Sequence, residues 1–157
     1  MSLEHEEITG PLIGAAIAVH KELGPGFLES VYEKALVLEL RKRAIPFQRQ
    51  VAVPILYQGV EVGVHRLDLF ASDEIVVEIK AVKEITDLHF AIVRSYLRAV
   101  RRKHGLILNF SKQTLDVKRV LAPDPRSSCP SCFPQRQSDD VVERDHDGEK
   151  ENRETPD

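Results

Sequence analysis

The stretch Arg66-Leu-Asp-Leu-Phe-Ala-Ser-Asp-Glu-Ile-Val-Val-Glu-Ile-Lys-Ala-Val82 decides how this chain folds. Residues 66–71 and 75–82 are rich in Leu, Ile, Val and Phe, as strands are. The polar residues between them, Ser72-Asp73-Glu74, are typical of a tight turn. The stretch therefore predicts a β-hairpin.

Three polar side chains of this hairpin are predicted to share one face. If the hairpin is symmetric about Asp73, Asp68 lies opposite Glu78. Because side chains alternate between faces along a strand, Lys80 lies on the face of Glu78 and Ile79 points to the other. Two opposed carboxylates, roughly 4.5–5.5 Å apart at Cβ, repel each other. A fold tolerates such a pair where a cation lies between the carboxylates or where the hairpin is solvated.

This pattern suits a site for a hard divalent cation. Mg²⁺ binds oxygen ligands and keeps several waters, so Asp68, Glu78 and a backbone carbonyl near Ile79 can hold it. The ion would lower the pKa of a bound water and neutralise charge on a scissile phosphate. Lys80 could orient that water or stabilise the developing charge. The alternative is a surface hairpin with an ordinary Glu–Lys pair, because Glu-x-Lys alone is a very common strand pattern.

Composition indicates one globular domain followed by a tail. The chain has 157 residues, enough for one domain with a hydrophobic core. Residues 1–122 carry 17 basic and 15 acidic side chains, whereas residues 123–157 carry 5 and 10. The predicted domain, residues 1–122, is therefore mildly basic, which permits nucleic-acid binding without demanding it. The Pro-, Ser- and acid-rich residues 123–157 are predicted to be a disordered tail.

Membrane insertion and disulfide scaffolding are not expected. No apolar stretch is long enough to cross a bilayer, and the short run 11–19 follows glutamates rather than basic residues. We therefore expect a cytoplasmic protein without a membrane partner. The two cysteines, Cys129 and Cys132, both fall in the tail, where C-x-x-C supplies only half of a zinc site.

The remaining pattern predicts a mixed architecture. Apolar residues three and four apart indicate helices over residues 6–23, 27–43 and 86–103. Alternating apolar residues indicate further strands that start at Phe47 and Val60 and that cover residues 105–110 and 115–121. The order helix, helix, three strands, helix, two strands predicts an α/β (α+β) sandwich with a central mixed sheet of about five strands.

Several motifs resemble one protein family. Gly26-Phe-Leu-Glu29-Ser-Val-Tyr32 matches the G-x-x-E-x-x-Y signature of the GxxExxY protein family. Motifs that resemble that family follow in the expected order: Arg66-Leu-Asp68, Val77-Glu-Ile-Lys80-Ala-Val82, Ser95-Tyr-Leu97 and Gly105-Leu-Ile-Leu-Asn-Phe110. The family is grouped with the PD-(D/E)XK nuclease-like superfamily. The resemblance, over about residues 6–121, implies a restriction-endonuclease-like core in which helices flank the sheet.

The resemblance also implies roles for individual residues. Asp68 fits the metal-binding aspartate, and Glu78 and Lys80 fit the E-x-K motif. Glu29 fits an acid that the amino-terminal helix brings to Mg²⁺ (or Mn²⁺). The local alternative for Glu29 is a first-turn glutamate that the helix dipole favours. Tyr32, one turn further on, fits a packing or hydrogen-bonding support.

The helix over residues 86–103 departs from the family pattern. Related nucleases often carry Gln-x-x-x-Tyr there; Tyr96 fits the tyrosine, but Ile92 stands in the glutamine position. Opposite the apolar face, the helix is predicted to present four arginines that either contact phosphates or form a solvated face. They are Arg94, Arg98, Arg101 and Arg102.

Three hypotheses follow. The first is a metal-dependent nuclease that hydrolyses phosphodiester bonds in DNA or RNA. The second is a catalytically weak or inactive nuclease-like module that binds nucleic acid or a protein partner, which Ile92 favours. The third is a structural or homo-oligomeric protein with solvated acids. Fold membership alone does not choose among them.

Overall fold

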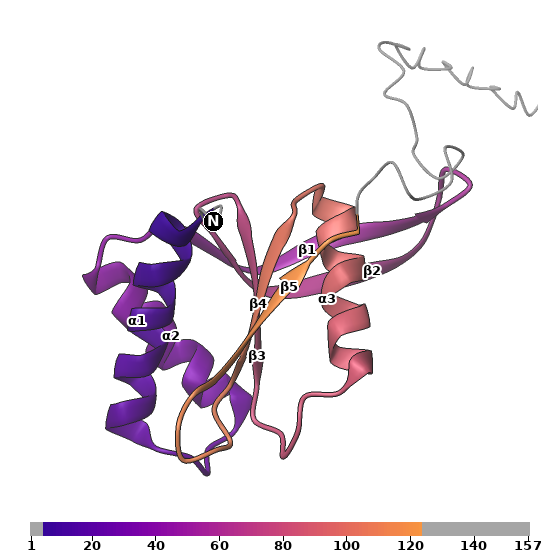
Figure 1. Cartoon of the computed structure of the whole chain (residues 1–157). Coiled ribbons are helices and arrows are strands. Elements are labelled where there is room, and N and C mark those ends of the chain that lie inside the picture. Colours follow the sequence, from indigo (N-terminus) through magenta and orange to yellow (C-terminus); the bar gives the residue numbers. More distant parts are fainter. Residues whose placement is uncertain (1–4, 124–157) are drawn as a thin grey trace, which may run out of the picture.

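The computed structural model describes residues 5–123, which form three helices and five strands (Figure 1). The helices are α1 (Glu6–Leu23), α2 (Glu29–Lys42) and α3 (Asp87–Val100). The strands are β1 (Phe47–Tyr57), β2 (Val60–Ala71), β3 (Ile75–Lys80), β4 (His104–Asn109) and β5 (Asp116–Leu121). Most of the predicted tail, with Cys129 and Cys132, lies outside the described residues.

The strands form one mixed sheet in the order β1-β2-β3-β4-β5. Neighbouring strands are antiparallel except β3 and β4, which are parallel and joined through α3. Leu69 pairs with Val77, and Ala71 pairs with Ile75, so the hairpin is symmetric about Asp73 as predicted. The α+β fold class with a mixed sheet is confirmed.

The helices cover both faces of the sheet and enclose two hydrophobic cores. In Figure 1, α1 and α2 lie on one side of the sheet and α3 on the other. Leu69, Val77 and Ile79 belong to the core under α1 and α2. Val76 and Ile107 belong to the core under α3. The alternation along β3 therefore turns Glu78 toward the α3 face of the sheet.

Two helix boundaries differ from the predictions by two or more residues. Helix α2 begins at Glu29 rather than residue 27, because Gly26 has φ 111° and Leu28 is still extended. Helix α3 ends at Val100 rather than residue 103. Arg101 there adopts a left-handed conformation with φ 56°, which a continuing helix cannot contain.

The alternation of β2 breaks at Asp68. Leu67 packs in the core under α3, but Leu69, two residues on, packs in the core under α1 and α2. Gln50, on the facing strand, has φ 51° and leaves a gap in the regular register between Arg49 and Val51. At left-handed Gln50 the side chains of both strands switch from one face of the sheet to the other. Asp68 lies at this switch, which we call the face reversal.

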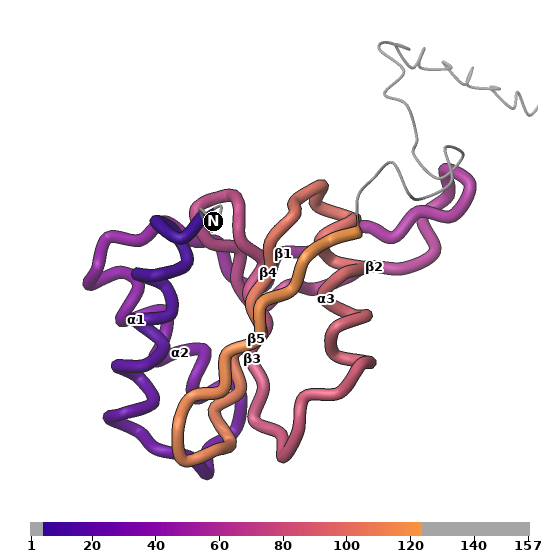
Figure 2. The backbone as a smooth tube through the Cα atoms, in the orientation of Figure 1, coloured from indigo at the N-terminus to yellow at the C-terminus, as the bar shows by residue number. Residues whose placement is uncertain are grey.

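Beyond this point β1 and β2 run on as a two-stranded arm. Their pairing continues to Tyr57 and Val60, whereas β3 pairs with β2 only at Leu69–Ala71. In Figures 1 and 2 the hairpin projects past α3. We refer to residues 51–67 as the β-arm.

Candidate active site

The candidate site lies where β2 and β3 separate. The Ile79 N–H donates to Asp68 Oδ2 across 2.9 Å. The Asp68 side chain therefore bonds a backbone group of β3 at the first position beyond the regular β2–β3 register. We call the place where the two strands separate the fork. The bond fixes the Asp68 carboxylate there, although Ile79 lies eleven residues further along the chain.

Glu78 and Lys80 form a buried ion pair beside it. Lys80 Nζ lies 2.9 Å from Glu78 Oε1, and the side chains are only 19% and 6% exposed for Lys80 and Glu78. The other oxygen, Glu78 Oε2, is buried and has no hydrogen-bond partner among residues 5–123. A buried carboxylate oxygen without a partner is costly, so this atom is suited to accept a proton or a cation.

The two carboxylates oppose each other's ionisation. Burial and then the charge of Asp68 raise the pKa of Glu78 to about 7. Burial also raises the pKa of Asp68, and its bond from Ile79 offsets this only in part. Burial alone would lower the pKa of Lys80, but its hydrogen bond to Glu78 and the neighbouring acids raise it. Two acids with raised pKa values beside an amine are typical of functional sites.

The backbone of Ile79 adds an oxygen at the same fork. The Lys80 carbonyl accepts from Phe110 N, so Lys80 directs its backbone groups toward β4. Because neighbouring residues of a strand direct their backbone groups to opposite sides, the Ile79 carbonyl is directed toward β2, as its N–H is. Asp68, Glu78 and this carbonyl thus converge from two strands.

Glu29 reaches the end of β3 from helix α2. The Ala81 N–H donates to Glu29 Oε1 across 3.2 Å, although Glu29 itself is exposed. The negative charge of Glu29 raises the pKa values of both Asp68 and Glu78. The structure places Glu29 at the rim of the site, one residue past Lys80.

Tyr32 anchors the chain that leads into Glu29. Its ring is fully buried and stacks on Phe110 at 4.4 Å between centroids. Its hydroxyl donates to the Gly24 carbonyl at 2.6 Å and accepts from Phe27 N at 3.2 Å. These bonds tie both sides of the Gly-Pro-Gly break to α2 and so fix where the helix starts.

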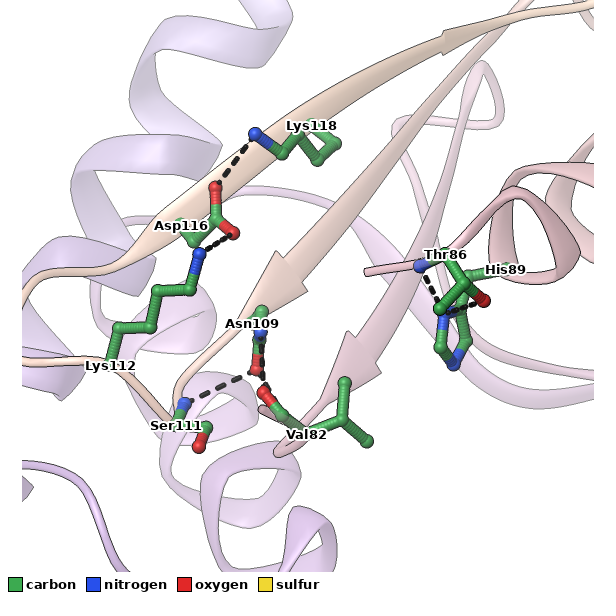
Figure 3. A network of polar contacts seen from close by, with 8 residues as sticks. All are labelled: Val82, Thr86, His89, Asn109, Ser111, Lys112, Asp116 and Lys118. Atoms are coloured by element: carbon green, nitrogen blue, oxygen red, sulfur yellow. Dashed lines mark hydrogen bonds and ion pairs between the residues drawn. The ribbon is translucent and has the colours of Figure 1, made fainter. Parts of the chain in front are cut away.

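Asn109 holds the chain that leaves β3. This fully buried amide accepts from Val82 N at 3.1 Å and donates to the Val82 carbonyl at 2.8 Å (Figure 3). It also accepts from Ser111 N at 3.2 Å. The segment after Lys80 is therefore bonded to β4. Figure 3 also shows His89 beside Thr86, whose N–H donates to His89 Nδ1 at 2.9 Å at the start of α3.

The oxygen atoms at the fork fit a magnesium-type ion. No three His, Cys, Asp or Glu side chains within residues 5–123 form a group that could hold a metal by themselves. Mg²⁺ needs fewer, because it is usually bound through one or two carboxylates and retains water. Asp68 and Glu78 with the Ile79 carbonyl satisfy that requirement, and the unpartnered Glu78 Oε2 supplies a direct observation for it.

Tyr96 lies near the acid pair on the α3 side. Burial and then the charges of Glu78 and Asp68 raise the pKa of its phenol. The ring of His65 meets it edge-on at 4.6 Å between centroids, and His65 Nε2 lies 3.1 Å from Ser95 Oγ. His65 and Ser95 were not predicted to lie here. The face reversal at Asp68 turns His65 toward α3, so regular alternation along the strand could not predict this contact.

Glu33 is a second residue that the sequence analysis missed. Its charge raises the pKa of Asp68. Glu33 accepts from Arg49 Nη2 and from Gln50 Nε2, each at 2.9 Å. The spacing of four from Glu29 on α2 was an available signal, since residues four apart share a helix face.

The four predicted arginines are not gathered in one place. Arg102 lies beyond α3, donates to the Asp73 carbonyl at 2.7 Å and pairs with Glu74. It therefore lies at the β2–β3 turn, at the other end of β3 from Glu78. Arg94 lies over the Phe90 ring at 5.8 Å, and Arg98 is exposed. The predicted arc of four on one helix is wrong for Arg101 and Arg102, because the helix ends at Val100.

The raised pKa of Glu78 predicts a pH-dependent stability. A carboxyl whose folded pKa is raised stabilises the fold when protonated, and this contribution is lost as pH rises through the folded value. We therefore expect the free energy of unfolding to fall between about pH 5 and pH 7, by up to about 3 kcal/mol from this group. Urea titrations at several pH values would measure it. Glu78→Gln should remove most of the slope, and an unchanged slope would contradict the assignment.

Comparisons with curated proteins and with solved structures carry no assignment of function. None of the helices within residues 5–123 has the length and apolarity that crossing a membrane requires. A search of curated proteins found no match. Among solved structures, the chain is similar to the one titled "Crystal structure of SSO0001", with a TM-score of 0.47 and 18% identity. That match covers 80% of this chain and 63% of the other.

A family model provides the stronger result. The model described as the PD-(D/E)XK nuclease superfamily matches residues 6–120, which include every helix and nearly every strand residue described above. Asp68, Glu78 and Lys80 lie inside the match, in the order that the name of the superfamily gives. The chain therefore belongs to the PD-(D/E)XK nuclease superfamily.

Proposed function

We propose that this protein is a metal-dependent nuclease that hydrolyses phosphodiester bonds in DNA or RNA. The observation that carries the proposal is the convergence of Asp68, Glu78 and Lys80 at the fork between β2 and β3. Superfamily membership supports it, because members of this superfamily are nucleases by name. Mg²⁺ or Mn²⁺ is the proposed cofactor, nucleic acid the proposed partner and the cytoplasm the proposed location.

Each residue has a distinct part in this proposal. Asp68 and Glu78 would hold the ion through their carboxylates, and the Ile79 carbonyl would add a third oxygen. The bound ion would supply Lewis-acid stabilisation and a more acidic water. Glu29, at the rim, would assist in holding the ion. Ion binding would leave Glu78 ionised at neutral pH, because a cation lowers the pKa that burial has raised.

Lys80 is proposed to act on the scissile phosphate. Its ammonium now lies against Glu78 Oε1 at 2.9 Å. Once parted from Glu78, the Lys80 ammonium would hydrogen-bond a phosphate oxygen or the attacking water. Tyr96 and Tyr32 are proposed as supports, the first beside the acids and the second under the start of α2.

A binding module without turnover is the second candidate. Lys80 is already satisfied by Glu78, and Ile92 stands where related nucleases carry glutamine. In that case Glu78 and Lys80 would form a structural pair, and the domain would hold nucleic acid or a protein without cleaving it. Cleavage assays distinguish the two candidates.

The nuclease proposal predicts that Lys80→Ala reduces cleavage by about 100-fold or more, the usual effect of losing one charge-stabilising donor. Single- and double-stranded DNA and RNA should be incubated with Mn²⁺ and followed on denaturing gels. Lys83→Ala, an exposed lysine three residues away, is the matched control and should cleave normally. Salt-sensitive binding by the wild type without cleavage of any substrate would favour the binding module.

A further inference from the structure

Residues 27–31 expose an apolar surface at the rim of the candidate site. Three large apolar side chains in this range are 36–77% exposed: Phe27, Leu28 and Val31. Glu29, which lies among them, accepts from the Ala81 N–H, one residue past Lys80. In Figure 1 the loop between α1 and α2 and the segment that follows β3 lie at the same end of the sheet. An apolar surface therefore borders the site at which phosphate chemistry is proposed.

The ring of Phe27 is held in place although 46% of the residue is exposed. The Phe27 N–H donates to the Tyr32 hydroxyl at 3.2 Å, and the two rings meet at 82° with 6.0 Å between centroids. Tyr32 is itself fully buried and stacks on Phe110. Because rings at this angle contact edge to face, at least one face of Phe27 is left uncovered by Tyr32. An aromatic face held in this way can bind a flat partner at little further cost in ordering.

We propose that Phe27 is a stacking platform for an unpaired nucleobase next to the scissile phosphate, which makes single-stranded DNA or RNA the substrate class. This inference rests on the proposed function, because the nuclease reaction brings nucleobases to the rim. Bases of every kind have a flat face that stacks on an aromatic side chain. The Glu29 carboxylate, two residues from Phe27, repels phosphate. The uncharged base is therefore the part of a nucleotide that suits this surface.

The size of the surface favours a base over a protein partner. Three side chains that each expose on the order of 100 Å² give roughly 300 Å², whereas a stable protein interface takes about 800 Å² from each partner.

The ring face also favours unpaired over paired nucleotides. The bases of a duplex are stacked on one another and present only their edges in the grooves. A nucleotide of a duplex would first have to flip out of the helix and lose its own stacking and pairing. Phe27 should therefore contribute to the binding of single strands and contribute little to the binding of duplexes.

Phe27→Trp tests stacking directly, because the chain has no tryptophan of its own. The full chain should carry Lys80→Ala as well, so that strands stay intact in the presence of Mn²⁺. Short single strands of DNA or RNA should quench most of the tryptophan fluorescence, since a stacked base contacts the indole ring. A strand of the same length without bases, and a duplex, should leave it nearly unchanged. Leu38→Trp, 65% exposed and nine residues further along α2, is the matched control and should not be quenched.

Affinity provides a second measurement on the same background. Phe27→Ala should weaken the binding of single strands by about 5- to 150-fold, the usual effect of losing one stacked base. Phe27→Trp should bind them at least as tightly as Phe27 does. Fluorescence anisotropy of labelled strands would measure both, and far-ultraviolet circular dichroism would check that each variant is folded.

The outcomes separate this inference from the proposed function. Equal quenching by strands with and without bases, unchanged affinity in Phe27→Ala, or no binding of single strands would each overturn the stacking role. Cleavage of nucleic acid by the wild type without quenching of Phe27→Trp would leave the nuclease proposal standing alone. Quenching by single strands without cleavage of any substrate by the wild type would support stacking and contradict the nuclease proposal.

Discussion

Replacement of Asp68 by alanine is expected to weaken Mn²⁺ binding by about 100-fold or more and to abolish cleavage. Outer-shell substitutions in metal sites already cost about 10–100-fold, and loss of a ligand should cost at least as much. Asp68 is one of two carboxylates at the fork, so its loss leaves only Glu78, which Lys80 then neutralises. Calorimetric titration of the wild type and the variant with Mn²⁺ would measure the difference.

A second variant separates metal binding from folding. Alanine also removes the acceptor for the Ile79 N–H, which costs about 1–3 kcal/mol when a buried donor is left unpaired. Asp68→Asn keeps an acceptor at that position but removes the charge, so it should fold normally and still lose the ion. Asp73→Asn, 73% exposed at the tip of the same hairpin, is the matched control. Equal Mn²⁺ affinity in Asp68→Asn and wild type would rule out the site.

Replacement of Tyr32 by alanine is expected to lower the free energy of unfolding by about 3–5 kcal/mol, as for other large aromatic truncations. The ring is fully buried against Phe110, and its hydroxyl ties Gly24 and Phe27 to α2. Urea-induced unfolding, followed by circular dichroism, would measure the loss. Leu38→Ala, on the same helix but 65% exposed, should change stability by no more than about 0.5 kcal/mol.

The hydroxyl of Tyr32 can be examined separately. Tyr32→Phe keeps the ring and its stacking but leaves the Gly24 carbonyl and the Phe27 N–H without their partner, at a cost of about 1–3 kcal/mol. If the hydroxyl only supports the fold, metal affinity should stay near wild type. If it also positions Glu29, metal affinity should fall. A Tyr32→Ala protein as stable as wild type would contradict the anchoring role.

The hairpin and its register could be predicted from the sequence because all of their causes are local. Apolar alternation, a polar turn and symmetry about Asp73 determine which residues face each other, and Leu69 pairs with Val77 accordingly. Glu78 and Lys80 lie on one face of β3 for the same reason. The grouping of Glu78 and Lys80 on one face could therefore be predicted without the rest of the chain.

The contribution of Glu29 could not be predicted in this way. Its contact with Ala81 joins residues 52 positions apart and depends on how α2 packs across the sheet. Only the resemblance suggested it. Glu33, whose charge raises the pKa of Asp68, shares a helix face with Glu29, but that spacing alone does not relate a residue of α2 to Asp68 on β2.

The reversal at Gln50 and the end of α3 were missed because ordinary residues adopt left-handed conformations there. Glycine would have marked either position, but Gln50 and Arg101 carry side chains that are usually right-handed or extended. At Arg101 the cause is tertiary: the next residue, Arg102, bonds to the Asp73 carbonyl. The sequence pattern of residues 86–103 does not indicate that hydrogen bond.

The face reversal at Asp68 separates the part of β1 and β2 that forms the site from the part that forms the β-arm. Residues between Val51 and Leu67 can then gain or lose hairpin length in pairs without changing the register at the fork. Evolution could therefore remodel the protruding ribbon while Asp68 and Glu78 keep their places.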